Sequence, residues 1–323
     1  MRIIYVPQFP TEMRYQSWWA SKIPEEFIKS GHEVIILGKE YINMIKHKQS
    51  SIEMFSPINA AIELECEQIK EYMNMSIRNG DVLFLSDLSF PGFFANALYH
   101  KQCSKMFCFC HATSINKFDY FSNVSYSKFD VESAHSELFN KIFIGSYYHE
   151  KKLTNNYNYD EYSSYWRNCI VTYLPFPPFK SSSLTEKKYN IMSASRPTPQ
   201  KVDLKLENEV EKIFGIIYRP ISNSWQEYYD NLSQSKILLI SAVEDTFGYQ
   251  IVDAIMNGCI PIARNDLAYP ELLSEEYLYN NIDELVDKIN KILNSDDFLP
   301  IPKLLCENQM NNFYKNIIKE MEE

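Results

Sequence analysis

The chain has 323 residues, of which 45% are hydrophobic and 23% are charged. This length and apolar content suit two globular domains and exclude wholesale disorder. No apolar run approaches the roughly 18–20 residues that span a bilayer, and residues 1–10 lack the pattern of a signal peptide. Seven scattered cysteines without a C-x-x-C pair indicate free thiols in a reducing cytoplasm.

The net charge of −10 is unevenly distributed along the chain. Residues 1–180 carry 18 Lys and Arg against 19 Asp and Glu, whereas residues 181–323 carry 14 against 23. The acidity therefore lies in the C-terminal half. The composition shows no overall excess of basic residues of the kind that binds nucleic acid, although the N-terminal half is close to neutral.

The N-terminal half alternates between short apolar segments and segments with helical spacing. The apolar segments predict strands at 2–6, 33–37, 82–85, 106–110 and 142–144. Helical spacing predicts helices at 16–30, 60–78 and 91–100. Apolar strands that alternate with helices indicate a parallel sheet covered on both faces.

A stretch rich in proline and serine interrupts this alternation at 174–183. We therefore predict a linker at 176–186, between domains at 1–175 and 187–323. The alternation then resumes, with strands at 189–194, 237–240 and 259–263 and helices at 202–213, 248–257, 282–293 and 303–321. The predicted fold is α/β, with two doubly wound Rossmann-like domains facing a cleft, and the last helix is a candidate to cross back. Such folds bind ligands at the carboxyl ends of their strands.

The most informative stretch of the sequence is 244–263. It follows a predicted strand and opens a helix, where free backbone N–H groups and the helix dipole suit a phosphate. Gly248 allows the backbone to approach a ligand closely. Asp245 and Asp253 are spaced to lie near one helix face, where two carboxylates can accept hydrogen bonds from sugar hydroxyls. The alternative is a helix-capping Asp245 and a solvated Asp253.

This stretch resembles the donor-binding signature of retaining GT-B glycosyltransferases, E-x-F-G-x-x-x-x-E-A followed by a Gly and a Pro. The residues that match in register are Phe247, Gly248, Ala254, Gly258 and Pro261, and Asp245 and Asp253 replace the two glutamates. The resemblance implies a GT-B fold and a UDP- or GDP-hexose donor. It implies that Asp245 acts on the transferred sugar and that the nucleotide is bound by Thr246, Phe247, Gly248, Tyr249 and Asp253. Glu244 is one position out of register and is the alternative candidate for the first glutamate.

A second segment, 195–203, resembles the G-R-x-x-x-x-K-G turn of the same family. The resemblance implies that Arg196 and Lys201 neutralise the donor pyrophosphate, so that no metal is required. Fixed cations suit this task because a leaving diphosphate carries a high negative charge. The alternative is a pair of surface cations near a helix start.

His111 ends the predicted strand at 106–110, at the carboxyl edge of the first sheet. A His at this place in the superfamily points toward the transferred sugar, which makes His111 a catalytic candidate. Cys108 and Cys110 precede it, but their spacing is wrong for a zinc knuckle. Buried core cysteines are the simpler interpretation.

The segments 266–273 and 276–279 are similar to the C-terminal part of the tRNA-queuosine mannosyltransferases, and the similarity extends from Phe247 to about residue 285. Those enzymes glycosylate a modified base. The family's glycine-rich acceptor loop is replaced here by residues 8–19. The acceptor candidates in and beyond this loop are Arg14, Tyr15, Trp18, Trp19 and Asp87, with 116–120 of lower rank. Aromatic rings there could stack a base or sugar; the alternative is that Trp19 packs in the core and Trp18 covers the domain edge.

Together these features predict a cytoplasmic, metal-independent, retaining glycosyltransferase that moves a hexose from a nucleotide sugar to a hydroxyl. The acceptor is a glycan, a small molecule, or a modified base in tRNA or hydroxymethylated DNA. Six lysines form a candidate basic patch for nucleic acid: Lys105, Lys117, Lys128, Lys141, Lys151 and Lys152. The competing hypotheses are a GT-B epimerase or phosphorylase and a non-catalytic nucleotide-sugar-binding module.

Overall fold

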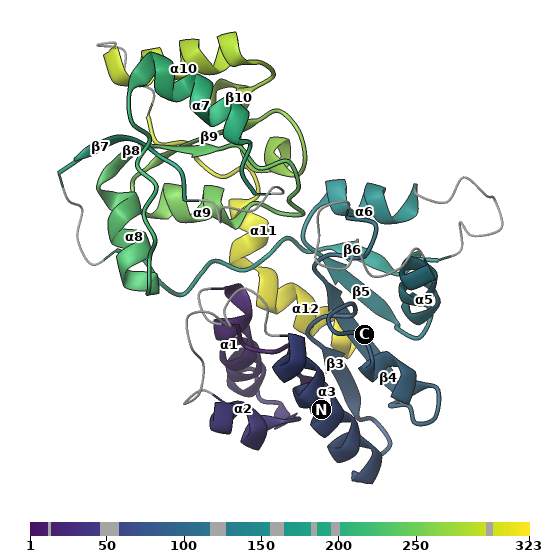
Figure 1. The fold of residues 1–323 in the computed structure, drawn as a ribbon. Coiled ribbons are helices and arrows are strands. Elements are labelled where there is room, and N and C mark those ends of the chain that lie inside the picture. Colours follow the sequence, from purple (N-terminus) through teal and green to yellow (C-terminus); the bar gives the residue numbers. More distant parts are fainter. Residues whose placement is uncertain are drawn as a thin grey trace.

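The computed structural model describes residues 1–11, 14–45, 58–116, 127–155, 165–181, 186–194, 201–294 and 300–323. It consists of two α/β lobes, the first and the second domain, each built on one parallel sheet (Figure 1). The first lobe holds the N-terminal part of the chain, and the second follows the connection near residues 172–188. No helix in the described ranges is long and apolar enough to span a membrane.

The first sheet has six strands in the order β2-β1-β3-β4-β5-β6, and every neighbouring pair is parallel. The strands are β1 (Arg2–Val6), β2 (Glu33–Ile36), β3 (Val82–Leu85), β4 (Lys105–Cys110), β5 (Lys141–Ile144) and β6 (Cys169–Val171). The central strands are buried along almost their whole length because helices cover both faces.

Alternate residues of these strands contribute to two separate cores. One face carries aromatic rings, with Tyr5, Phe84 and Phe143 stacked at centroid distances of 6.0 Å. The other face carries smaller side chains, among them Ile4, Leu83 and the buried Cys108 and Cys110. This period of two follows from the pleat of a strand. Aromatic residues make up 15% of the sequence, and part of this aromatic content is therefore core.

The helices of the first lobe divide between these faces. They are α1 (Tyr15–Lys29), α2 (Lys39–Ile45), α3 (Ile58–Asn74), α4 (Phe94–Leu98), α5 (Ser127–Ser136) and α6 (Tyr147–Thr154). Phe27 of α1 contacts the rings of Tyr5 and Phe84 on the aromatic face. Tyr72 of α3 packs on Phe94 of α4 in the other core.

The second sheet has four parallel strands in the order β10-β9-β8-β7. The strands are β7 (Tyr189–Met192), β8 (Ser235–Ile240), β9 (Ile260–Arg264) and β10 (Leu278–Tyr279). Its helices are α7 (Leu204–Phe214), α8 (Trp225–Ser233), α9 (Tyr249–Met256) and α10 (Ile282–Asn294), with 3-10 turns at Tyr269–Glu271 and Glu275–Tyr277. Side-chain N-caps begin α7 at Asp203 and α8 at Ser224, as helix starts prefer.

The last two helices, α11 (Glu307–Asn311) and α12 (Phe313–Glu322), bring the chain back to the first lobe (Figure 1). The sequence pattern predicts one helix at 303–321, whereas the structure has two that meet at Asn312. Phe313 of α12 is fully buried against Trp19 and Phe109. The aromatic core of the first lobe is thus completed by a distant part of the chain.

The α/β class predicted from the sequence is confirmed, because both sheets are wholly parallel. The sequence pattern did not predict α2, α5, α6, α8, β6 or β10. Helices α5 and α6 are rich in polar residues and have weak apolar spacing, and β6 has only three residues. Helix α8 does carry aromatic and apolar residues at helical spacing, so it was missed despite a usable signal. Helix α4 covers only Phe94–Leu98 of the helix predicted at 91–100.

Truncation of Phe313 tests whether α12 holds the first lobe together. We expect Phe313→Ala to lower the free energy of unfolding by about 3–5 kcal/mol, because it removes a fully buried ring and leaves a cavity. Urea denaturation followed by tryptophan fluorescence measures this change. The exposed Lys315→Ala in the same helix serves as the control and should be nearly neutral. An equal effect of the two substitutions would contradict the packing role of α12.

Candidate active site at the domain interface

The β8–α9 loop, residues 241–248, leads from the end of β8 into α9. Gly248 at its end has a φ of 99°, in the left-handed region that favours glycine. A Cβ at this position would lie 2.9 Å from a ring carbon of Tyr269. Glycine is therefore required here by both the backbone conformation and the available space, which accounts for one residue of the predicted motif.

Thr246 binds this loop to the first domain. Its hydroxyl donates to the carbonyl of His111 at 2.8 Å, and its own carbonyl accepts from the Ser146 hydroxyl at 2.6 Å. His111 follows β4, and Ser146 follows β5 and caps α6. The loop of the second domain thus meets the carboxyl edge of the first sheet directly, in the region where the fold predicts ligand binding.

Glu244 extends its side chain from the same loop into the first domain. Lys152 Nζ donates to both of its carboxylate oxygens, at 2.8 and 2.9 Å. Asn116 Nδ2 donates to Glu244 Oε1 at 3.0 Å. The Glu244 side chain is only 10% exposed, so the first domain supplies the polar partners that a buried carboxylate needs. The Glu244 carboxylate is therefore paired with the first domain, whereas the Asp245 carboxylate lies beside Lys201.

Glu271 makes a third contact between the domains. Its two carboxylate oxygens accept from the backbone N–H groups of Tyr147 and Tyr148, at 2.9 and 2.6 Å. These are the first two residues of α6, where N–H groups lack helical partners and an anion is favoured. Helix α6 thus contacts the second domain at its N-terminus through Glu271 and Thr246, and at Lys152 through Glu244.

His111 is enclosed by aromatic rings. Tyr15, Trp19 and Phe109 lie with ring centroids 4.5–4.6 Å from its imidazole. Its Nε2 lies 3.2 Å from the carbonyl oxygen of Ser86, which can only accept, so Nε2 carries the hydrogen. Burial lowers the pKa of His111 to about 3. The ring is neutral at physiological pH and suits hydrogen bonding or orientation of a ligand, not charge stabilisation.

Lys201 and Asp245 meet at the carboxyl edge of the second sheet. Lys201 Nζ lies 3.5 Å from Asp245 Oδ2 and donates to the carbonyl of Glu244 at 3.0 Å. Asp245 also accepts from Tyr269 OH at 3.4 Å and from the N–H of Phe247 at 3.4 Å. The structure therefore brings together the predicted cation and the first predicted carboxylate. Arg196 lies outside the described residues.

Asp253 faces a different element from Asp245. Tyr228 and Tyr229 of α8 donate to its two oxygens at 3.1 and 3.3 Å. Its side chain is buried, so Asp253 is not a solvated helix residue. Its hydrogen-bond partners on α8 also differ from the partners of Asp245. Burial raises the pKa of Asp253 to about 7, an effect that the two tyrosine hydroxyls reduce.

Phe247 and Tyr249 act in packing at the interface. Phe247 is 4% exposed and lies against Gly145 of the first domain. Tyr249 donates to the carbonyl of Pro175 at 3.0 Å, and its ring contacts Tyr15 and Trp18. Both side chains contact the first domain directly. The motif residues between the two aspartates thus join the domains as well as shaping the loop.

The aromatic acceptor candidates are mostly part of the core. Trp18 and Trp19 are 5% and 2% exposed, which matches the packing alternative and leaves little ring surface for stacking. Tyr15 is half-buried and lies between His111 and Tyr249. Arg14 is the N-cap residue of α1 and is half-buried, and its neighbours 12–13 lie outside the described residues.

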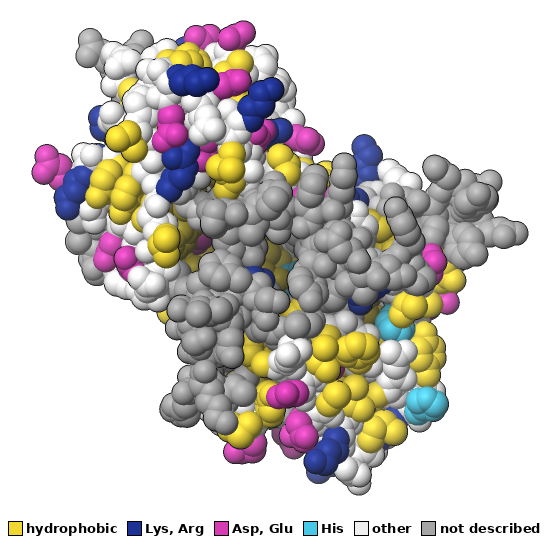
Figure 2. Space-filling view, in the orientation of Figure 1, with side chains coloured by type: hydrophobic (Ala, Val, Ile, Leu, Met, Phe, Trp, Pro, Cys, Tyr) yellow, Lys and Arg dark blue, Asp and Glu magenta, His cyan; other side chains and the backbone are white. Residues whose placement is uncertain are grey.

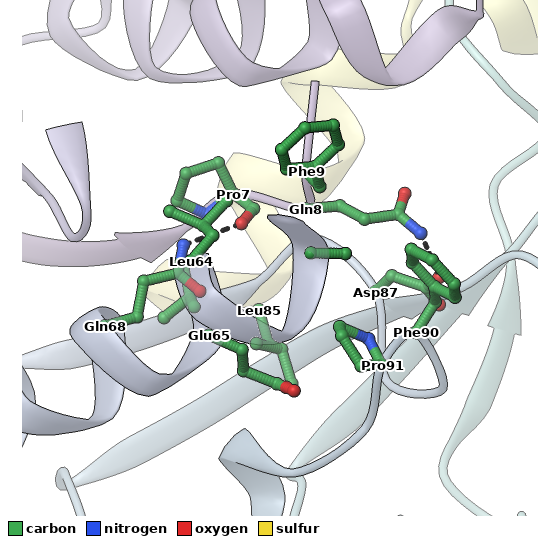
Figure 3. A pocket seen from close by; sticks show the side chains of 12 residues that line it. Pro7, Gln8, Phe9, Leu64, Glu65, Gln68, Leu85, Asp87, Phe90 and Pro91 are labelled. Carbon is green, nitrogen blue, oxygen red and sulfur yellow. Dashed lines mark hydrogen bonds between the residues drawn. The ribbon is translucent and has the colours of Figure 1, made fainter. Parts of the chain in front are cut away.

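Asp87 follows β3 and lies beside Gln8, which follows β1. Gln8 Nε2 donates to Asp87 Oδ2 at 2.7 Å, and Figure 3 shows this contact at the side of a small pocket lined also by Phe9 and Phe90. The cavity volume is about 10 Å³, close to the minimum for one water molecule. This pocket does not admit a sugar ring in the conformation described.

The candidate lysines do not form one surface. Lys105 and Lys141 begin β4 and β5, at the amino edge of the sheet, whereas Lys152 lies at the domain interface near the opposite edge. Lys128 donates to the backbone carbonyls of Ser89 and Pro91. Lys117 lies outside the described residues, as do 118–120. On the face shown in Figure 2, Lys and Arg of the second domain are interspersed with Asp and Glu.

Sequence reasoning named Lys152 only as part of a basic patch, and it missed five other partners that hold the site together: Ser146, Tyr228, Tyr229, Tyr269 and Glu271. Ser146 had a local signal, since a serine that follows a predicted strand at the carboxyl edge is also a good N-cap. The others are recognised only once the two domains and α8 are placed. Among the described residues, no three His, Cys, Asp or Glu side chains lie together as metal ligands would.

No family model matches the chain. Over 138 residues it is 29% identical to the tRNA-queuosine alpha-mannosyltransferase of Drosophila melanogaster. The match covers 43% of this chain and 32% of that protein, so the chain spans about a third of the length of this curated relative.

Several solved structures are similar over the whole chain, each at 10% identity. Anabaena HepE in complex with UDP and glucose has a TM-score of 0.63 and covers 100% of this chain and 97% of its own. The apo lipopolysaccharide outer core galactosyltransferase WaaB has a TM-score of 0.62, with 100% and 99% covered. Sucrose-phosphate synthase from Thermosynechococcus elongatus has 0.60, with 100% and 94% covered. The predicted GT-B fold is confirmed.

The raised pKa of Asp253 predicts a pH-dependent stability. Between about pH 4 and pH 7 the folded protein holds this proton and the unfolded chain releases it, so the free energy of unfolding falls as pH rises. Asp253→Asn cannot release a proton and should remove this fall, on the order of 1–4 kcal/mol between those limits. Urea denaturation at about pH 5 and pH 8 measures it, with the exposed Asp283→Asn as control. Parallel pH profiles of wild type and Asp253→Asn would refute the assignment.

Proposed function

We propose that this protein is a glycosyltransferase that moves a hexose from UDP-hexose or GDP-hexose to an acceptor hydroxyl. The observation that carries the proposal is the meeting of Asp245 and Lys201 at the carboxyl edge of the second sheet, on a loop bound directly to His111 of the first domain. The GT-B fold and the match to a mannosyltransferase support it, as do the complexes of HepE with UDP and UDP-glucose.

The proposed transfer is retaining and requires no metal. Lys201, with Arg196, stabilises the leaving diphosphate, as fixed cations do where charge develops. The acceptor hydroxyl attacks on the face from which the phosphate departs and gives its proton to that phosphate. A neutral His111, held neutral by its burial, orients the sugar and takes no part as a base. Asp245 contacts the transferred sugar.

Asp253 contacts the donor ribose in this proposal. Its two oxygens already accept from tyrosine hydroxyls in the structure. A ribose hydroxyl offers the same kind of donor, so we expect it to take the place of Tyr228, whose ring is the less buried of the two. We place the reaction in the cytoplasm, since all seven cysteines are free.

The acceptor is a hydroxyl of a glycan or small molecule in our first proposal. The net charge of −10 and the separation of Lys105 and Lys141 from the interface support it, because phosphate contacts supply most nucleic-acid affinity. One observation favours the second candidate, a modified base of tRNA or DNA: the sequence match to a tRNA-queuosine mannosyltransferase. An epimerase or a non-catalytic binder would transfer no sugar to any acceptor.

Removal of Lys201 tests the donor site. Lys201→Ala should lower kcat/KM for the donor by an amount that corresponds to about 2–4 kcal/mol of lost transition-state stabilisation. A thermal-shift panel of nucleotide sugars first identifies the donor, and kcat/KM is then measured with it. The exposed Lys188→Ala, at the amino edge of the same sheet, is the matched control. EDTA should leave the wild-type rate unchanged. Undiminished kcat/KM in Lys201→Ala, or a strict need for a divalent metal, would reject the assignment.

The acceptor is tested by mass spectrometry of nucleosides from cells with and without the protein. Transfer to a glycan or small molecule predicts that no hexosylated nucleoside depends on the protein, because no nucleic acid then receives the sugar. A hexosylated nucleoside that appears only with the protein would replace this proposal by the second candidate. Digests of tRNA and DNA analysed separately would then identify the nucleic acid.

A further inference from the structure

Glu244 is bound from both sides of the domain interface. Its carboxylate accepts three hydrogen bonds from the first domain, two from Lys152 and one from Asn116. Its main-chain carbonyl accepts from Lys201 of the second domain. The residue that follows it is Asp245, whose carboxylate lies 3.5 Å from the same Lys201 amine. One residue thus connects the first domain to both donor-site groups.

Because the Lys152–Glu244 ion pair is largely buried, the hydration of its two charges depends on the contact between the domains. The side chains of Lys152 and Glu244 are 22% and 10% exposed. When the domains are apart, both charges are hydrated and separate. When the domains are in contact, the Glu244 carboxylate loses its hydration and requires a charged partner, because an unpaired buried charge is strongly unfavourable. Asn116 helps by supplying a further donor, and it is itself held by the N–H of Thr113 at 3.0 Å.

We propose that Glu244 is a positioning residue, paired with Lys152, that couples contact between the domains to the placement of Asp245 and Lys201. The proposal rests on the transfer reaction proposed above. In the joined arrangement the Lys152–Glu244 pair fixes the β8–α9 loop, and the Glu244 carbonyl holds the Lys201 amine beside Asp245. Without the pair the donor still binds the second domain, but the Asp245 carboxylate and the Lys201 amine are no longer fixed in position relative to His111.

The test compares Lys152→Ala and Glu244→Lys with the combined exchange, Lys152→Glu with Glu244→Lys. Each single change should lower kcat about tenfold or more, because the joined arrangement becomes less populated. The exchange restores opposite charges and should regain most of the loss. Lys212→Ala, an exposed lysine in the last turn of α7, should stay within about twofold of the wild type.

Two further measurements separate positioning from loss of fold. Binding of UDP and of GDP by calorimetry should change less than about threefold in the single variants, since the nucleotide is held by the second domain. Small-angle X-ray scattering of the unliganded proteins should show a larger radius of gyration for the single variants than for the wild type and the exchange variant. This readout requires no activity.

Single variants with wild-type scattering and wild-type kcat would overturn the proposal. An exchange variant as slow as the single variants, with unchanged scattering throughout, would do the same. If the wild type transfers sugar from no donor, the proposed function fails. The scattering comparison then still decides whether the Lys152–Glu244 pair holds the domains together.

Discussion

Two polar groups of the β8–α9 loop are satisfied by partners from the other domain, and much of the site follows from this constraint. The Thr246 carbonyl accepts from Ser146, and the Glu244 carboxylate accepts from Asn116 and Lys152. Those three residues all follow β4 or β5. Two sheets whose carboxyl edges meet therefore stabilise each other through groups that would be costly to bury alone.

Aromatic packing determines the chemistry that His111 can perform. The rings that fill one face of the first sheet continue through Phe109 to Trp19 and Tyr15 and surround the imidazole. A charged ring would lose its hydration there without gaining a carboxylate partner, which is the reason for its lowered pKa. The same packing buries Trp18 and Trp19, which leaves little of either ring exposed to stack a base.

The sequence was most informative where chemistry is local. Apolar strands, the Gly248 turn and the place of His111 after β4 each depend on a few neighbouring residues, and the structure shows all of them. The helical spacing that predicts α1 also places Trp19 on its buried face, so the packing alternative was already contained in the pattern.

The remaining features depend on distant residues. Lys152 and Glu244 are 92 positions apart, and nothing near either one indicates the other. The surroundings of Asp253 depend on α8, whose two adjacent tyrosines donate to the Asp253 carboxylate. Without α8 in place, Asp253 looks like a solvated helix residue. Interdomain pairing and the burial of a single carboxylate both require the tertiary fold, which a local pattern does not contain.

The return of α12 to α1 affects how this protein is synthesised. On the ribosome, α1 and the first sheet emerge before the second domain, and the surface that later receives Phe313 stays uncovered while that domain is made. Domains made early usually fold as they emerge, but here the ring that packs against Trp19 and Phe109 belongs to a helix that is made after the second domain. The aromatic core of the first domain is therefore completed only after α12 has left the ribosome.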